Sequence, residues 1–188
     1  MLVSDTALRR LLEAGRAVVS ELDVEVVLDR ILKTAADVTG ARYVALGVLD
    51  EERGELERFV TYGVPESVHR EIGDPPRGRG VLGVLIDDPR PLRTDSVTRH
   101  PRSYGFPEGH PHMETFLGVP IMIRGKAWGN LYLCEKRDGT PFTDADEEAV
   151  VVLSEWAAIA VENARLYSNS EQRRVELERA VRRLEATT

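Results

Sequence analysis

The sequence predicts an α+β domain, in which an antiparallel sheet occupies the middle of the chain and helices from both ends pack on one of its faces. Apolar residues recur every three or four positions near both ends of the chain, which is typical of amphipathic helices. Between these segments lie runs rich in β-branched and aromatic residues, which are typical of strands. The 188 residues are enough for one such domain with additional helix.

Two helices are expected before the first strand. Residues 1–22 carry one apolar stripe, which runs through Gly15 and Val18, and we interpret this segment as a signalling and dimerisation helix. Asp23 is a suitable N-cap for a second helix, because its side chain can accept hydrogen bonds from the first free N–H groups. Gly40 is placed to end this helix, because glycine adopts a left-handed backbone without strain.

Two pairs of strands are expected next. Residues 42–50 and 55–63 form the first pair, and Gly54 suits the turn between them. Residues 115–123 and 127–135 form the second pair, which is joined by a short turn. The two pairs together predict one antiparallel sheet.

A long insert, residues 64–114, separates the two pairs of strands. It holds two possible short helices, in the stretches ESVHREI and GVLGVLIDD, between pieces rich in proline and glycine. Because loops on a rigid scaffold often carry binding residues, a ligand site is expected between this insert and the sheet.

A long helix closes the chain. Thr143 and Asp146 have the spacing of a capping box, in which each residue satisfies a free N–H of the other. We predict a core sensory domain over residues 23–167 and a C-terminal connecting helix over 168–188, which leads toward a further domain. In the connecting helix the apolar positions are one helical turn apart and suit packing on a partner helix: Leu177, Val181 and Leu184.

Composition and charge limit the possible functions. The net charge of −7 argues against nonspecific nucleic-acid binding, which needs dense positive charge. The chain has no apolar run long enough to cross a bilayer, and its first residues lack the pattern of a secretory signal. Cys134 is the single cysteine, so an internal disulfide is excluded. These features predict a cytoplasmic protein with no membrane or nucleic-acid partner.

The sequence resembles a GAF domain across residues 20–167. The resemblance rests on the stretches ARYVALGVLD, GRGVLGVLI, FLGVPIMIRGKAWGNLYLCEK and FTDADEEAVVVLSEWAAIAVENARLY. The stretch GFPEGHPHMETFLGVP resembles, more narrowly, the first GAF domain of actinobacterial dormancy sensor histidine kinases of the DevS/DosS type. That resemblance implies a domain that holds haem b, responds to a diatomic gas or to redox state, and controls a kinase.

The same resemblance implies roles for particular residues. His110 matches the proximal ligand of the haem iron, and Tyr132 matches the tyrosine that hydrogen-bonds a ligand on the distal side. His112 stands where those sensors carry proline, so this second histidine could compete with His110 or block the pocket. The expected pocket lies between the insert and the sheet, with these further lining residues: Leu82, Leu85, Ile86, Phe106 and Met113.

The sequence contains none of the phosphate-loop, nucleophile-elbow or zinc-protease motifs, so we expect no catalysis by this chain itself. The preferred interpretation is the input domain of a two-component sensor histidine kinase, which forms a homodimer through its terminal helices and binds a small molecule. The alternative is a ligand-free GAF domain that serves as a dimerisation and protein-interaction module. Uptake of a small molecule separates the two interpretations.

Overall fold

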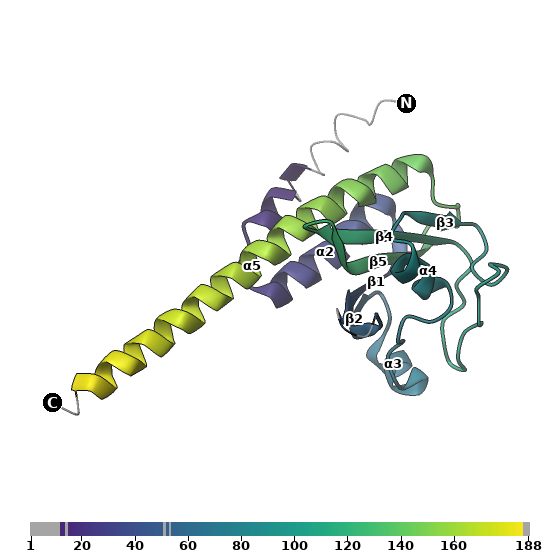
Figure 1. Cartoon of the computed structure of the whole chain (residues 1–188). Coiled ribbons are helices and arrows are strands. Elements are labelled where there is room, and N and C mark those ends of the chain that lie inside the picture. Colours follow the sequence, from purple (N-terminus) through teal and green to yellow (C-terminus); the bar gives the residue numbers. More distant parts are fainter. Residues whose placement is uncertain (1–11, 14, 51, 53, 186–188) are drawn as a thin grey trace.

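The computed structural model describes residues 12–13, 15–50, 52 and 54–185 (Figure 1). Five antiparallel strands form one sheet in the order β2-β1-β5-β4-β3, which confirms the predicted α+β class. The strands are β1 (Ala41–Leu49), β2 (Leu56–Tyr62), β3 (Leu92–Thr94), β4 (Phe116–Ile123) and β5 (Lys126–Lys136).

Helices lie on both sides of this sheet. The two long helices, α2 and α5, pack together on one face, while α4 and the rest of the insert lie on the other (Figure 1). The helices are α2 (Val24–Thr39), α3 (Glu66–Ile72), α4 (Val81–Asp87) and α5 (Asp144–Glu185).

The main core fills the space between the sheet and the pair α2 and α5. Successive strand residues point to opposite faces of a sheet, so every second residue of β4 and β5 reaches this core. Burial of each such side chain stabilises the fold by about 1.5–3 kcal/mol. The fully buried members from these two strands are Leu117, Val119, Ile121, Leu131 and Leu133.

The ends of α2 are the ones that the sequence predicts. The Asp23 carboxylate accepts a hydrogen bond from the N–H of Glu25 over 2.8 Å. At the other end Gly40 has φ of 75°, and its N–H donates to the Ala36 carbonyl over 2.9 Å. Both caps satisfy backbone groups that the helix itself leaves unpaired.

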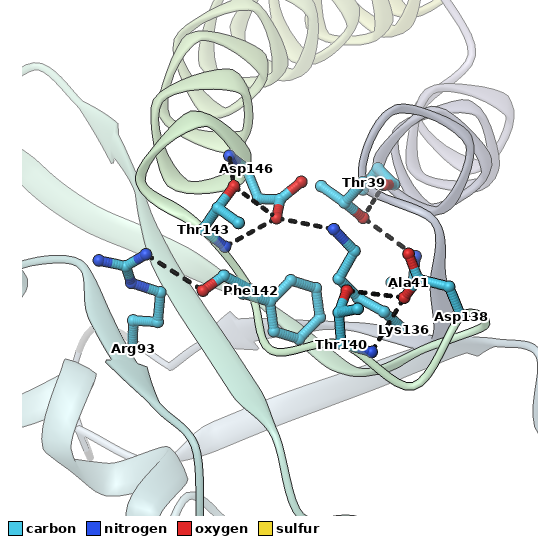
Figure 2. Close-up of polar contacts among 10 residues, drawn as sticks. Thr39, Ala41, Arg93, Lys136, Asp138, Thr140, Phe142, Thr143 and Asp146 are labelled. Carbon is cyan, nitrogen blue, oxygen red and sulfur yellow. Dashed lines mark hydrogen bonds and ion pairs between the residues drawn. The ribbon is translucent and has the colours of Figure 1, made fainter. Parts of the chain in front are cut away.

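The predicted capping box at the start of α5 is also confirmed (Figure 2). The N–H of Thr143 donates to the Asp146 carboxylate over 2.8 Å, and the N–H of Asp146 donates to the Thr143 hydroxyl over 3.3 Å. The same carboxylate lies 3.0 Å from the ammonium group of Lys136, at the end of β5. One acidic side chain therefore joins the first turn of α5 to the sheet.

The insert contains the two predicted short helices and one strand that was not predicted. This strand, β3, pairs with β4 at the edge of the sheet through Leu92, Arg93 and Thr94. Three residues are too few to show the alternation of apolar and polar positions that identifies a strand.

Both end segments of the chain are helical where the structure describes them. Residues 1–11 of the expected helix over 1–22 lie outside the described residues, whereas residues 15–19 are helical. A Cβ atom on Gly15 would lie 2.3 Å from the ring of Trp156, so this segment packs closely on α5. The helix α5 continues without a break beyond residue 167 and projects away from the sheet (Figure 1). The expected division between 23–167 and 168–188 therefore stays a prediction.

Candidate functional site

A cavity of about 700 Å³ lies between the sheet and the insert. Its volume is within the range of about 300–1,000 Å³ that small-molecule sites occupy. The sheet contributes Phe59 from β2, Phe116 from β4 and Tyr132 from β5. The insert contributes residues from α3, from the start of α4 and from the loop over residues 103–113.

The predicted lining residues fall into two groups. His110, Tyr132 and three apolar residues line the cavity: Leu82, Phe106 and Met113. The other two, Leu85 and Ile86, are not part of its wall, which corrects their placement in the pocket.

Packing explains both corrections. Leu85 is fully buried against β4, and a Cβ atom on Gly118 would lie 2.9 Å from its side chain. Ile86 lies against Gly78, whose Cβ would be 2.4 Å from the end of the Ile86 side chain. Val81 and Leu82, about one turn earlier in α4, line the cavity, and the backbone carbonyl of Leu82 accepts a hydrogen bond from Tyr132.

His110 is held in one orientation by its neighbours. Its ring stacks on Phe106 with 4.4 Å between the ring centroids, and its backbone N–H donates to the Pro107 carbonyl over 3.2 Å. Its Nδ1 atom lies 2.8 Å from the carbonyl oxygen of Pro111. Because a carbonyl only accepts hydrogen bonds, Nδ1 carries the proton in this contact, and the neutral ring keeps the lone pair of Nε2 for another partner.

The neighbouring histidines lie elsewhere. The side chain of His112 is 82% exposed, and its Nε2 atom is 3.8 Å from the Glu114 carboxylate. His112 does not line the cavity, so in this conformation it does not block it. His100 also lies outside the cavity wall, and its Nδ1 accepts a hydrogen bond from the N–H of Arg102 over 3.2 Å.

Tyr132 is almost completely buried in the floor of the cavity. Its ring lies between those of Phe59 and Phe116, with centroid distances of 6.2 Å and 6.1 Å. Its hydroxyl group accepts a hydrogen bond from the Asn130 amide over 3.1 Å. Burial raises the pKa of Tyr132, so its hydroxyl stays protonated and serves as a donor at neutral pH.

Residues 21–162 match the family model described as GAF domain. The chain belongs to the GAF domain family. This GAF domain is similar to the probable 3',5'-cyclic phosphodiesterase pde-5 of Caenorhabditis elegans, with 23% identity over 183 residues, which cover 89% of this chain and 25% of that protein. The chain thus spans a quarter of the length of this relative.

Several solved structures share the fold. The GAF domain of a phosphoenolpyruvate-protein phosphotransferase from Coxiella burnetii has a TM-score of 0.74 and 22% identity, over 87% of this chain and 96% of that one. Free methionine-R-sulfoxide reductase from Neisseria meningitidis has a TM-score of 0.70 and 19% identity, over 89% of this chain and 96% of that one. Identities this low show the common fold alone.

A second set of contacts fixes the loop that carries His110 to the sheet of the GAF domain. The carboxylate of Glu135, at the end of β5, accepts hydrogen bonds from the N–H groups of Glu114 and Thr115. The Glu114 carboxylate in turn accepts from the Ser96 hydroxyl, and this hydrogen bond is the main reason why the pKa of Glu114 lies below its usual value. The end of the cavity loop is therefore tied to two other parts of the domain.

Several parts of the cavity wall were not predicted. The rings of Phe59, Phe116 and Tyr43 lie on the floor, and the strand alternation would have placed them there once the register was known. Cys134 also faces the cavity, and burial raises the pKa of its thiol to about 12. Arg79 is part of the wall as well, and no local sequence signal distinguishes it from other arginines of the insert.

Metal-binding clusters and membrane-spanning helices are both absent from the residues that the structure describes. No group of three or more histidine, cysteine, aspartate or glutamate side chains is arranged there to hold a metal ion. Among the helices of the described part, none has the length and apolar character that crossing a membrane requires.

Proposed function

We propose that this GAF domain is the input domain of a cytoplasmic signalling protein and binds a small molecule in the cavity between the sheet and the insert. The cavity itself carries the proposal, because it combines an apolar wall with a few polar groups that point toward one space. His110 and Tyr132 are two of these groups, and they approach the cavity from the insert and from the sheet. The alternative, a ligand-free interaction module, gives no reason for these groups to face a common space.

Haem b is the ligand that we propose first, as the resemblance to the DevS/DosS-type sensors implies. The residues fit this group: the Nε2 lone pair of His110 is free of the Pro111 contact, and a neutral imidazole is a common ligand of haem iron. The stacking on Phe106 and the Nδ1 contact with Pro111 hold the ring, so less entropy is lost when a ligand binds. When bound, haem would supply reversible binding of a diatomic gas or a change of redox state.

Tyr132 would act from the floor of the same cavity. Its hydroxyl lies 3.4 Å from the Leu82 carbonyl, which is a long hydrogen bond and a weak competitor for the proton. A ligand with an acceptor atom in the cavity would take this proton in place of Leu82. We assign no catalytic role to Tyr132 or to Cys134, since the raised pKa of each group keeps it protonated and a poor nucleophile.

We infer that the signal leaves through α5, which joins the sheet to the projecting end of the domain (Figure 1). Two copies of the chain would pack these helices in parallel as a homodimer, and a two-component histidine kinase is the output that the family resemblance implies. Ligand binding would change the helix packing only if the two packing states differ in ligand affinity.

A titration of hemin into the 188-residue protein, followed by visible absorption, tests the haem assignment. We expect a Soret band for the wild type and its loss in His110→Ala. His100→Ala and His112→Ala are the controls and should keep the band, because both side chains lie outside the cavity wall. Loss of the band in His112→Ala instead would move the iron ligand to that residue. No hemin uptake by the wild type would contradict the haem assignment.

A further inference from the structure

The rim of the cavity carries an arginine that has no partner among the residues that the structure describes. Arg79 and Asp74 are the two formally charged residues of the cavity wall, and both are exposed to solvent. Arg79 makes no ion pair and no hydrogen bond with any residue that the structure describes. An arginine that faces an apolar cavity and keeps its guanidinium donors free is placed to bind an anion.

Other arginines of the insert are engaged elsewhere. Arg90 pairs with Asp88, and Arg102 pairs with Asp87. Arg93 joins β3 to the start of α5 through the Phe142 carbonyl and two acidic residues. None of these three lines the cavity.

The backbone on either side of Arg79 is fixed by close contacts. Gly78 and Gly80 both have positive φ, at 86° and 70°, which only glycine adopts without strain. A Cβ on Gly78 would meet Ile86 at 2.4 Å, and one on Gly80 would meet Tyr104 at 3.2 Å. The start of the Arg79 side chain is therefore held in place.

Asp74 is the other charge at the rim and would repel an anion. The chain beside it is less confined, because a Cβ on Gly73 would have no atom within 4 Å. Asp74 is also exposed, so water weakens its interaction with a bound anion. The Arg79 guanidinium has five donors that can hydrogen-bond to an anion, whereas Asp74 only repels the anion through water. The attraction to Arg79 therefore exceeds the repulsion from Asp74.

We propose that the ligand of this cavity is amphipathic, with a flat apolar body inside and an anionic group at the rim that Arg79 binds. The aromatic rings of Phe59, Phe106 and Phe116 give the body flat surfaces against which to stack. The proposal rests on the proposed function, because it requires that the cavity binds a small molecule. It adds the chemical class of that molecule and the residue that selects it.

Two dyes with the same aromatic body test this proposal. Anilinonaphthalene sulfonate carries an anionic group, and N-phenylnaphthylamine is its neutral counterpart. Fluorescence titration should show that Arg79→Gln weakens the binding of the sulfonate about three- to tenfold, as for an exposed charge-assisted contact. The neutral dye should bind Arg79→Gln and the wild type equally.

Matched variants locate the effect. Arg77→Gln removes an exposed arginine two residues away that does not line the cavity, so it should leave both dyes unaffected. Asp74→Asn should strengthen binding of the sulfonate. Ala45→Phe fills part of the cavity floor and should weaken both dyes, which places them in the cavity.

The outcomes separate this proposal from the proposed function. If the neutral dye binds in the cavity and Arg79→Gln changes the sulfonate no more than Arg77→Gln does, the anion proposal is wrong and the binding function stands. If neither dye binds in a way that Ala45→Phe affects, both proposals fail. If Arg79→Gln loses the binding of both dyes while its helical circular dichroism signal is unchanged, the proposed role of the Arg79 charge is also wrong.

Discussion

The hydroxyl group of Tyr132, on β5, donates a hydrogen bond to the backbone carbonyl of Leu82, on α4, over 3.4 Å. This contact joins the floor of the cavity to its opposite wall. The carbonyl of Leu82 only accepts hydrogen bonds, so the Tyr132 proton points toward it and the oxygen accepts from Asn130. The Asn130 amide group thus sets the direction in which Tyr132 donates.

Removal of the Tyr132 hydroxyl should destabilise the domain. Tyr132→Phe leaves the amide N–H of Asn130, which is fully buried, without its partner. We expect the free energy of unfolding in urea to fall by about 1–2 kcal/mol. Tyr104→Phe removes the hydroxyl of a tyrosine that is 86% exposed, so it should change the free energy of unfolding by less than about 0.5 kcal/mol.

A double variant tests whether Asn130 is the cause. In Asn130→Leu combined with Tyr132→Phe, both polar partners become apolar, so the second change should have a smaller effect than in the wild type. Equal effects in the two backgrounds would show that the two side chains act independently.

The local parts of the fold could be predicted from the sequence, because they depend on neighbouring residues. Asp23 and Gly40 bound α2, and Thr143 with Asp146 starts α5, since each cap requires particular residues at a fixed spacing. The strand β3 escaped prediction, because its pairing with β4 depends on residues that are distant in the sequence.

The candidate site could be predicted only in part. The resemblance to the DevS/DosS-type sensors implies that His110 and Tyr132 face a pocket, and both residues line the cavity. The orientation of α4 about its own axis does not follow from its sequence, because apolar residues lie all around this helix, and Leu85 and Ile86 were misplaced for this reason. Arg79 reaches the cavity through the backbone turns at its neighbouring glycines, which only the folded chain reveals.

The ion pair between Asp146 and Lys136 should contribute more to stability than exposed pairs do (Figure 2). The two side chains are only 11% and 14% exposed, and Asp146 also accepts hydrogen bonds from Thr143. Asp146→Ala leaves the Lys136 charge in a poorly hydrated place without its partner. We expect a loss of about 2–3 kcal/mol in the free energy of unfolding.

An exposed pair in the same domain serves as the control. Asp29 and Lys33 lie one turn apart on α2, and both side chains are more than half exposed. Asp29→Ala should lower the free energy of unfolding by less than about 0.5 kcal/mol. Equal losses in the two variants would contradict a special role of the pair at the start of α5.

Acid should weaken the hydrogen bonds of the Glu114 carboxylate, which fix the end of the cavity loop. Its pKa is lowered in the folded state, chiefly by the hydrogen bond from Ser96 and further by Thr98, His112 and Arg99. A lowered pKa means that the stabilisation is present above the usual glutamate pKa and is lost as the pH falls through the lowered value. In Ser96→Ala the titration midpoint of Glu114, followed by NMR, should therefore move to higher pH. Ser103→Ala changes another serine of the insert and should leave the midpoint of Glu114 unchanged. An unchanged midpoint in Ser96→Ala would show that the Ser96 hydrogen bond is not what lowers the pKa of Glu114.

The exposed face of α5 should form the homodimer contact. Four apolar side chains lie along one side of this helix, at separations of about two, three and one turns, and between about half and two-thirds of each is exposed. They are Ile159, Leu166, Leu177 and Val181. The last two follow Ala164, the last buried residue of α5, so the sheet of the same chain does not cover them. The end of α5 projects away from the sheet (Figure 1). A second copy carries the same stripe and would bury it in a parallel pair of helices.

Leu177→Asp should separate the dimer. Each copy would lose about 1.5–3 kcal/mol of apolar burial, so the dissociation constant should rise about 100-fold or more, as measured by light scattering over a range of concentrations. Arg179→Asp changes an exposed residue on the opposite side of the helix and should leave the dimer intact.

Removal of residues 168–188 should weaken the dimer in the same way while the core stays folded, because the buried residues of α5 end at Ala164. A wild-type protein that stays monomeric at high micromolar concentration would contradict the dimer. A dimer that resists both Leu177→Asp and the truncation would instead place the contact on another surface of the GAF domain.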